Sequence, residues 1–128
     1  MKEPFWLTRE VLDEIHKEQL EIHGGAHGTR DDGLLDSALN RAKQAFYYGQ
    51  SETIELAALY AHGLCKNRPY IDGNKRTAFL AAYTFFGLNG LQLTATEPEA
   101  TVAMLAFAAG EIDETGFAAW LRDHTEER

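Results

Sequence analysis

The sequence has few of the features that stabilise an extracellular protein or anchor one in a membrane. Its single cysteine, Cys65, cannot form a disulfide within the chain and lies in an apolar run, so we expect a buried thiol and a reducing environment. The longest apolar run, residues 78–88, is far shorter than the ~20 residues that cross a bilayer. The N-terminus carries charges where a signal peptide would be apolar. We therefore expect a soluble, cytoplasmic protein.

Positive charge is also scarce. The 128 residues include 12 Lys and Arg against 20 Asp and Glu, which gives a formal net charge of −8. Direct binding to nucleic acid needs a basic face that neutralises phosphates, so the composition argues against that class of partner. A local group of cations can still bind a nucleotide. The length suits one domain, residues 1–128, with a sizeable core.

Apolar residues recur at helical spacing through most of the chain, and no segment shows convincing strand alternation. Residues 91–94 are predicted to form a short extended segment, and the tail, residues 125–128, is expected to fray. The expected fold is all-α, a compact bundle of about six helices around a central apolar helix, about residues 74–88. The other predicted helices begin at the N-caps Thr8, Ser51, Thr96 and Asp113 and at about Gly33.

Histidines occur at three places in these helices. His16 and His23 lie seven residues apart on the first helix, which is compatible with a metal pair. No nearby group of Asp, Glu and His completes four ligands, so we interpret both as solvated surface residues. His62 is interpreted as a hydrogen-bonded structural histidine on an alanine-rich helix that approaches its neighbours closely.

The expected inward face of the first helix comprises Val11, Leu12, Ile15, Gln19 and Ile22.

A polar stretch, residues 66–76, separates the apolar helical run 54–65 from the run 78–88. Its residues are Lys-Asn-Arg-Pro-Tyr-Ile-Asp-Gly-Asn-Lys-Arg. A charged loop beside a core is costly unless its charges are paired, so the stretch is expected to bind something.

The local signals in this stretch predict an anion site. Pro69 ends the preceding helix, Gly73 permits a tight turn, and the next helix is expected to start at about Asn74. The first backbone N–H groups of that helix, together with Lys75 and Arg76, would face the turn. Phosphate is the anion that such an arrangement favours.

Each polar side chain of the turn suits a role in binding a nucleotide. Asp72 supplies a hard oxygen ligand, and one carboxylate plus phosphates is the usual way of holding Mg²⁺. Asn74 is expected to add its amide to the backbone donors. Lys75 and Arg76 would neutralise phosphate charge. A solvated helix start is the plain alternative for the two cations, but cations there oppose the helix dipole unless an anion joins them.

The loop between the first two helices, residues 24–33, contains too much glycine for regular structure. Its composition fits a plain connection and a functional loop equally well, so both interpretations stay open.

The polar turn resembles the signature of the Fic/Doc superfamily, His-Pro-Phe-x-Asp/Glu-Gly-Asn-Gly/Lys-Arg. The Asn-Lys-Arg-Thr-Ala continuation from Asn74 is similar to the death-on-curing (Doc) branch, as are residues 33–39 and 109–113. This resemblance implies a Fic-like bundle that uses ATP and Mg²⁺, with Asp72 at the metal and Gly73, Asn74, Lys75 and Arg76 at the nucleotide. It also implies that Gly28, Thr29 and Arg30 form a flap where a target segment docks.

The Doc branch is the toxin half of toxin–antitoxin pairs. The resemblance implies phosphoryl transfer to a protein hydroxyl, on elongation factor Tu, which arrests translation, and inhibition in trans by a Phd-like antitoxin. Fic-type AMP transfer is the first alternative, although Phe79 stands where such members carry a second arginine. A Ser/Thr-x-x-x-Glu-Gly/Asn self-inhibitory motif is not found; the nearest, residues 51–55, is followed by Leu56.

One signature position departs from the family, because Arg68 stands where the catalytic histidine is expected. A guanidinium stays protonated to above about pH 12 and has no lone pair to accept a proton. We therefore expect the chain to bind nucleotide but to transfer poorly or not at all. The further alternatives are a non-catalytic nucleotide- or partner-binding module in which Arg68 contacts phosphate, and a structural helical domain whose polar turn only caps helices.

Overall fold

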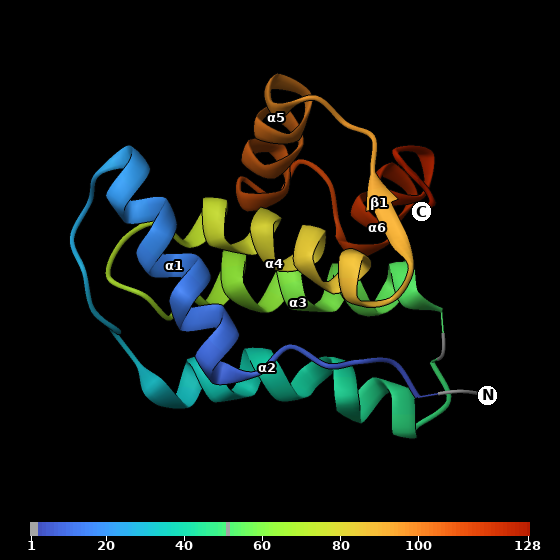
Figure 1. Ribbon diagram of the computed structural model, residues 1–128, viewed down its shortest axis with the longest axis horizontal. Coiled ribbons are helices and arrows are strands. Elements are labelled where there is room, and N and C mark those ends of the chain that lie inside the picture. Colours follow the sequence, from blue (N-terminus) through green and yellow to red (C-terminus); the bar gives the residue numbers. More distant parts are fainter. Residues whose placement is uncertain (1–2, 51) are drawn as a thin grey trace.

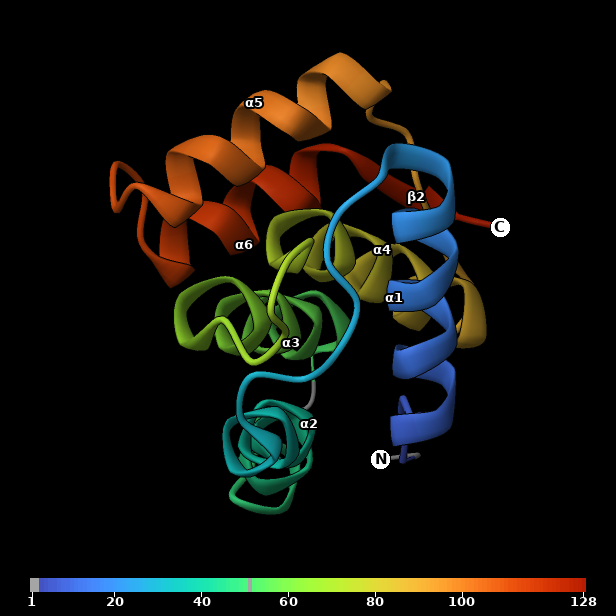
Figure 2. The ribbon, with the colours of Figure 1, turned by 90° about the vertical axis from the view of Figure 1, so that its left-hand side faces the viewer.

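Helices account for nearly all the regular structure of the computed structural model, which describes residues 3–50 and 52–128. Helices α3 and α4 pass through the middle, with α1 across one end, α2 on one side and α5 and α6 on the other (Figures 1 and 2). The prediction of an all-α bundle is confirmed. The elements are α1 (Arg9–His23), α2 (Asp32–Tyr47), α3 (Thr53–Asn67), α4 (Asn74–Leu88), β1 (Leu91–Leu93), α5 (Glu97–Ala108), α6 (Glu114–Asp123) and β2 (Thr125–Glu127).

The helix ends follow local capping chemistry. The hydroxyl of Thr8 accepts a hydrogen bond from the backbone N–H of Val11, and Thr96 forms a complete capping box with Glu99. Asp113 caps α6 by accepting from Gly116. These three predicted N-caps are confirmed, whereas Ser51 lies outside the described residues.

Helix α4 lies at the centre of the core, as predicted. Its inner side chains are buried, and the helix packs against α3, α1 and α5. Small residues allow helices α2 and α3 to approach closely: a Cβ atom added to Gly63 would lie 2.8 Å from the Cβ atom of Ala38. The largest fully buried side chains include Tyr60, Phe85, Phe86, Phe107 and Phe117.

Two expectations for α1 are wrong. The predicted inward residues Val11 and Ile22 are 39% and 76% exposed, while His16, expected on the surface, is 5% exposed. The buried face comprises Leu12, His16, Gln19 and Leu20, so it is rotated away from the most apolar stripe. The reason is that polar residues of α1 are buried against the loop before α4, a contact that apolar periodicity does not reveal. His23 is exposed, as predicted.

The expectation that the tail frays is also wrong. Residues 125–127 form strand β2, which pairs antiparallel with β1 in the register Leu91 to Glu127 and Leu93 to Thr125. The backbone N–H of Arg128 also donates to the carbonyl of Gly90 at 3.0 Å. These hydrogen bonds join segments far apart in the sequence, so the tail alone gave no sign of them. The extended segment predicted at residues 91–94 is confirmed over residues 91–93. No helix within the described ranges is long and apolar enough to cross a membrane.

The close contact between α2 and α3 predicts an unusual effect of an alanine substitution. Gly63→Ala should lower the free energy of unfolding by about 1–3 kcal/mol, because the added methyl group would overlap Ala38. The matched control is Gly87→Ala in α4, where the nearest atom is the mobile end of Arg128 at 3.3 Å. That variant should be neutral or more stable by up to about 1 kcal/mol. Urea unfolding of both variants measures the difference, and a Gly63→Ala protein as stable as its parent would contradict this packing.

Candidate functional site

The loop between α3 and α4, residues 68–73, carries the signature and is bounded by two left-handed residues. Gly73, the N-cap of α4, has φ 79°, which glycine adopts freely. Arg68, which ends α3, has φ 49° and ψ 58° and is the one non-glycine residue with positive φ in the described chain. Such a conformation costs of the order of 1–3 kcal/mol and is typical of functional sites. The sequence did not predict this left-handed conformation of Arg68.

Tyr70 anchors this loop to α1. Its side chain is 2% exposed, its hydroxyl donates to Asp13 at 2.7 Å, and its ring stacks on His16 with 3.7 Å between ring centroids. Burial raises the pKa of Tyr70, and the hydrogen bond to Asp13 adds to that rise, so the phenol stays protonated. Asp13 in turn contacts Arg9, whose guanidinium also contacts Asp32 on α2. The loop is therefore fixed through α1 to α2.

The Asn74 side chain closes the loop from the other side. Its Oδ1 accepts from the backbone N–H of Tyr70 and its Nδ2 donates to the Tyr70 carbonyl, both at 3.0 Å. Asn74 is 7% exposed, so these are buried hydrogen bonds. The amide that we expected to face a phosphate is thus occupied by Tyr70. A role of Asn74 in binding an anion therefore rests on its backbone N–H group.

Helix α4 begins without a side-chain cap, in contrast to α1, α2, α5 and α6. Among the described residues, none accepts a hydrogen bond from the backbone N–H of Asn74, Lys75 or Arg76. Lys75 and Arg76 are exposed and form no ion pair with a described residue. Free amides, the positive end of the helix dipole and two free cations therefore coincide at one point. That combination favours an anion.

The carboxylate of Asp72 lies at the edge of this helix start. Its Oδ1 accepts from the N–H of Gly73 at 2.9 Å, and its Oδ2 accepts from the N–H of Ala26 at 3.3 Å. Residues 3–50 and 52–128 contain no group of three or more His, Cys, Asp or Glu side chains that could hold a metal. One carboxylate together with phosphate oxygens is a common way for a protein to hold Mg²⁺, and Asp72 is a carboxylate of that kind.

The loop between α1 and α2 lies alongside the signature loop (Figure 2). Thr29 pairs with Tyr70 in an antiparallel bridge, and the carbonyl of Gly28 accepts from Ile71 at 3.1 Å. The guanidinium of Arg30 donates to the carbonyls of Asn67 and Arg68, at the C-terminal end of α3. The structure thus brings the three predicted flap residues, Gly28, Thr29 and Arg30, to the signature loop.

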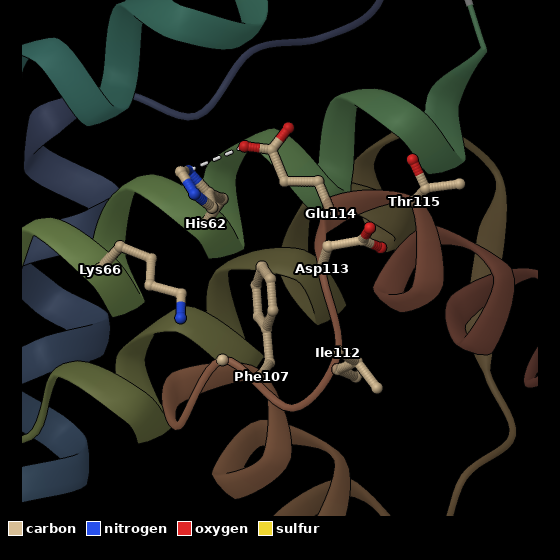
Figure 3. Close-up of a pocket in the computed structure, with 8 residues that line it drawn as sticks. His62, Lys66, Phe107, Ile112, Asp113, Glu114 and Thr115 are labelled. Atoms are coloured by element: carbon tan, nitrogen blue, oxygen red, sulfur yellow. Dashed lines mark ion pairs between the residues drawn. The ribbon is translucent and has the colours of Figure 1, made fainter.

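Two clefts open beside this assembly and share the side chain of Lys66. The cleft next to the flap has a volume of about 380 Å³ and is lined by three cations but by no carboxylate. The second cleft, about 400 Å³, lies between α3 and the start of α6 (Figure 3). Lys66, which we did not predict as a site residue, is the first residue of the polar stretch. The first cleft is lined by Arg30, Lys66, Asn67, Arg68, Tyr70 and Ile71.

His62 and Cys65 on α3 have structural surroundings, in agreement with the interpretations made from the sequence. His62 Nδ1 lies 2.9 Å from Glu114 Oε1 (Figure 3). Arg41 contacts the same oxygen at 2.7 Å. Burial lowers the pKa of His62. Cys65 is a free, buried cysteine, and burial raises the pKa of its thiol. Neither residue has the surroundings of a nucleophile.

The signature loop, the uncapped start of α4 and the loop carrying Gly28, Thr29 and Arg30 lie together in the fold, and known proteins offer a comparison for this arrangement. The model of the Fic/DOC family matches residues 6–86, which is more than half of the chain and includes both loops and the start of α4. The protein belongs to the Fic/DOC family.

Two curated relatives place it near the Doc toxins. The chain is 47% identical over 75 residues to "Toxin Doc" of Mycolicibacterium smegmatis, a match that covers 56% of this chain. The chain thus spans 57% of the length of that relative. It is also 28% identical over 117 residues to "Protein kinase doc" of Escherichia phage P1, a match that covers 91% of this chain and 92% of the phage protein.

The position of the Asn74 amide predicts a loss of stability without any ligand. Asn74→Ala should lower the free energy of unfolding by about 1–3 kcal/mol, because two buried backbone groups of Tyr70 lose their partners. Lys75→Ala, one residue further on an exposed face, is the control and should change stability by less than about 0.5 kcal/mol. Thermal and urea unfolding measure both. Equal stability of the two variants would assign the amide no structural role.

Proposed function

We propose that this protein is a Doc-like toxin that binds ATP with Mg²⁺ and belongs to the class of enzymes that transfer a phosphoryl group to a protein hydroxyl. The observation that carries the proposal is the uncapped start of α4, which follows Asp72 and Gly73 directly in the family signature and carries Lys75 and Arg76 in its first turn. The name of the phage relative, a protein kinase matched over 91% of this chain, favours phosphoryl transfer over AMP transfer.

Each residue of the site has a role in this function. The free backbone N–H groups of Asn74, Lys75 and Arg76 would hold phosphate oxygens, and the two cations would neutralise their charge. Asp72 would hold Mg²⁺, which when bound neutralises charge on the phosphates. Gly73 keeps the turn free of a side chain. The flap, already paired with the signature loop, would offer its edge to the protein segment that carries the hydroxyl.

Arg68 leaves the transfer step without a base. Removal of the hydroxyl proton requires a group with a free lone pair near the reacting oxygen, and a guanidinium has none. Binding and transfer are therefore separable in this protein: the phosphate-binding elements are intact, and the base is missing. We propose that the chain as it stands transfers weakly or not at all.

A second candidate function follows from the cleft beside the flap. Arg30, Lys66 and Arg68 line it, and no carboxylate does. In a non-catalytic nucleotide-binding module, Arg68 would contact a phosphate in this cleft instead of standing in for a base. The effect of replacing Arg68 on nucleotide affinity separates this function from the first.

A toxin of this kind needs an antitoxin, and we propose a Phd-like one that acts in trans, with elongation factor Tu as the target by resemblance. The names of both relatives support the toxin assignment. Exposed apolar side chains on α4 and α5 support a protein partner: Tyr83 is 52% exposed, Leu105 51% and Val102 69%. A segment that folds on binding could cover such a surface.

Restoring the family histidine should restore transfer. Arg68→His is expected to raise the rate of phosphoryl transfer to a target protein by about 10²–10⁴-fold, the usual contribution of a general base. Arg68→Gln is the matched control, because it removes the positive charge without supplying a base. Transfer of label from ATP to elongation factor Tu measures both. Equal rates in the His variant and the parent would refute the assignment, and lower ATP affinity in both variants would favour the binding module.

The position of the label decides which group is transferred. With the Arg68→His protein, label in the γ-phosphate of ATP should enter the target and label in the α-phosphate should not. Asp72→Asn in the same background should abolish the transfer, because it removes the carboxylate proposed to hold Mg²⁺. Incorporation of the α-label alone would overturn phosphoryl transfer in favour of AMP transfer.

A further inference from the structure

Helix α1 places two buried polar side chains, His16 and Gln19, under the signature loop. His16 is 5% exposed and Gln19 is 2% exposed, although both side chains are polar and other positions of α1 are open to solvent. With Leu20 they form one face of the helix, three and four residues apart. This face contacts both the signature loop and the α1–α2 loop, so its residues can affect the geometry of the site as well as the packing of the core.

His16 holds the backbone of the proposed metal ligand. Its Nε2 lies 2.8 Å from the carbonyl oxygen of Asp72, and because a carbonyl only accepts, Nε2 carries the proton. The same ring stacks on Tyr70, with an angle of 8° between the ring planes. One side chain of α1 therefore fixes two residues of the signature loop, by a directed hydrogen bond and by a stacked face.

Gln19 lies one turn further along α1, directly against Gly73. A Cβ atom at Gly73 would lie 2.0 Å from Gln19 Nε2, so the loop passes over the amide with no side chain between them. Within the described chain, neither Nε2 nor Oε1 of Gln19 has a hydrogen-bond partner. Leaving buried polar groups unpaired is destabilising, whereas an apolar side chain of the same shape can be nearly neutral. The amide is thus a destabilising feature at the N-cap of the anion-binding helix.

Leu20 extends the same contact to Gly25, in the loop between α1 and α2. A Cβ atom at Gly25 would lie 2.8 Å from Leu20 Cδ2 and 2.8 Å from Asp72 Oδ2. Gly25 also has φ 130°, which strains any other residue. The start of the α1–α2 loop and the signature loop therefore both lie against one face of α1, and Asp72 contacts Gly25 and Ala26.

We infer that His16 and Gln19 are positioning residues of the nucleotide site: His16 orients Asp72, and the unpaired amide of Gln19 hydrogen-bonds to the signature loop in the nucleotide-bound protein. This inference rests on the proposed function, since it assigns the two residues to the site proposed to bind ATP. Outer groups that orient a metal ligand typically change metal affinity by about 10–100-fold when they are replaced.

The test of His16 measures binding and not activity, so it applies to the protein with Arg68 in place. Calorimetric titration with ATP, with and without Mn²⁺ as a substitute for Mg²⁺, gives the gain in ATP affinity that the metal provides. His16→Phe keeps a ring for Tyr70 but removes the donor, and it should reduce that gain by about 10-fold or more. His16→Gln restores an N–H donor and should recover most of the gain. His23→Phe is the matched control on an exposed turn of α1 and should equal the parent.

The test of Gln19 separates a role in the site from a role in the core. Gln19→Met removes the unpaired amide at nearly constant volume, so the melting temperature of the ligand-free protein should stay the same or rise. Its affinity for ATP should fall by about 10-fold, which corresponds to the loss of one hydrogen bond. A merely structural amide would give the opposite pattern, a lower melting temperature with unchanged affinity.

The results that overturn the inference differ from those that overturn the proposed function. If the parent binds no ATP with or without Mn²⁺, the proposed function fails and the inference falls with it. If the parent binds Mn²⁺ and ATP and the His16→Phe and Gln19→Met variants bind equally well, the function stands and the inference is wrong. A Gln19→Met protein that loses stability and affinity together also contradicts the inference, because lost packing explains both changes.

Discussion

The backbone of Tyr70 is the point on which the arrangement of the site depends. The Asn74 amide bonds to both its N–H and its carbonyl, while its side chain is held by Asp13 and stacked on His16. These contacts fix a six-residue loop that otherwise lacks regular structure, and Thr29 pairs with its edge. Because Asn74, Thr29 and helix α1 all hold the loop, α4 starts at a defined place with its first backbone N–H groups free.

The site also depends on how two helix ends meet. The carbonyl end of α3 is satisfied by the guanidinium of Arg30, whereas the amide end of α4 has no partner among the described residues. The two dipole ends are treated differently: the negative end is neutralised within the protein and the positive end is left for an anion. In a chain with a net charge of −8, this local positive field stands out against an acidic surface. The match to the Fic/DOC family model includes this helix start.

In the proposed function, Arg68 removes the base while the shape of the loop around it stays intact. The residue adopts the left-handed conformation that ends α3, its carbonyl accepts from Arg30, and the loop beyond it is fully formed. Nothing in the packing requires a histidine at this exposed position. The scaffold that would hold a nucleotide is thus independent of the group that would accept a proton. Binding is a property of many contacts, and proton transfer is a property of one side chain.

Local sequence signals were enough to predict the helices, the caps Thr8, Thr96 and Asp113, and the bounds of α4, because capping and helical periodicity act over a few neighbouring residues. It also identified the signature loop, whose residues are contiguous. The burial of His16 against Asp72, 56 residues away, and the strand formed by residues 125–127 could be seen only in the folded protein. Those features depend on partners distant in the chain, and a residue's own neighbours carry no information about them.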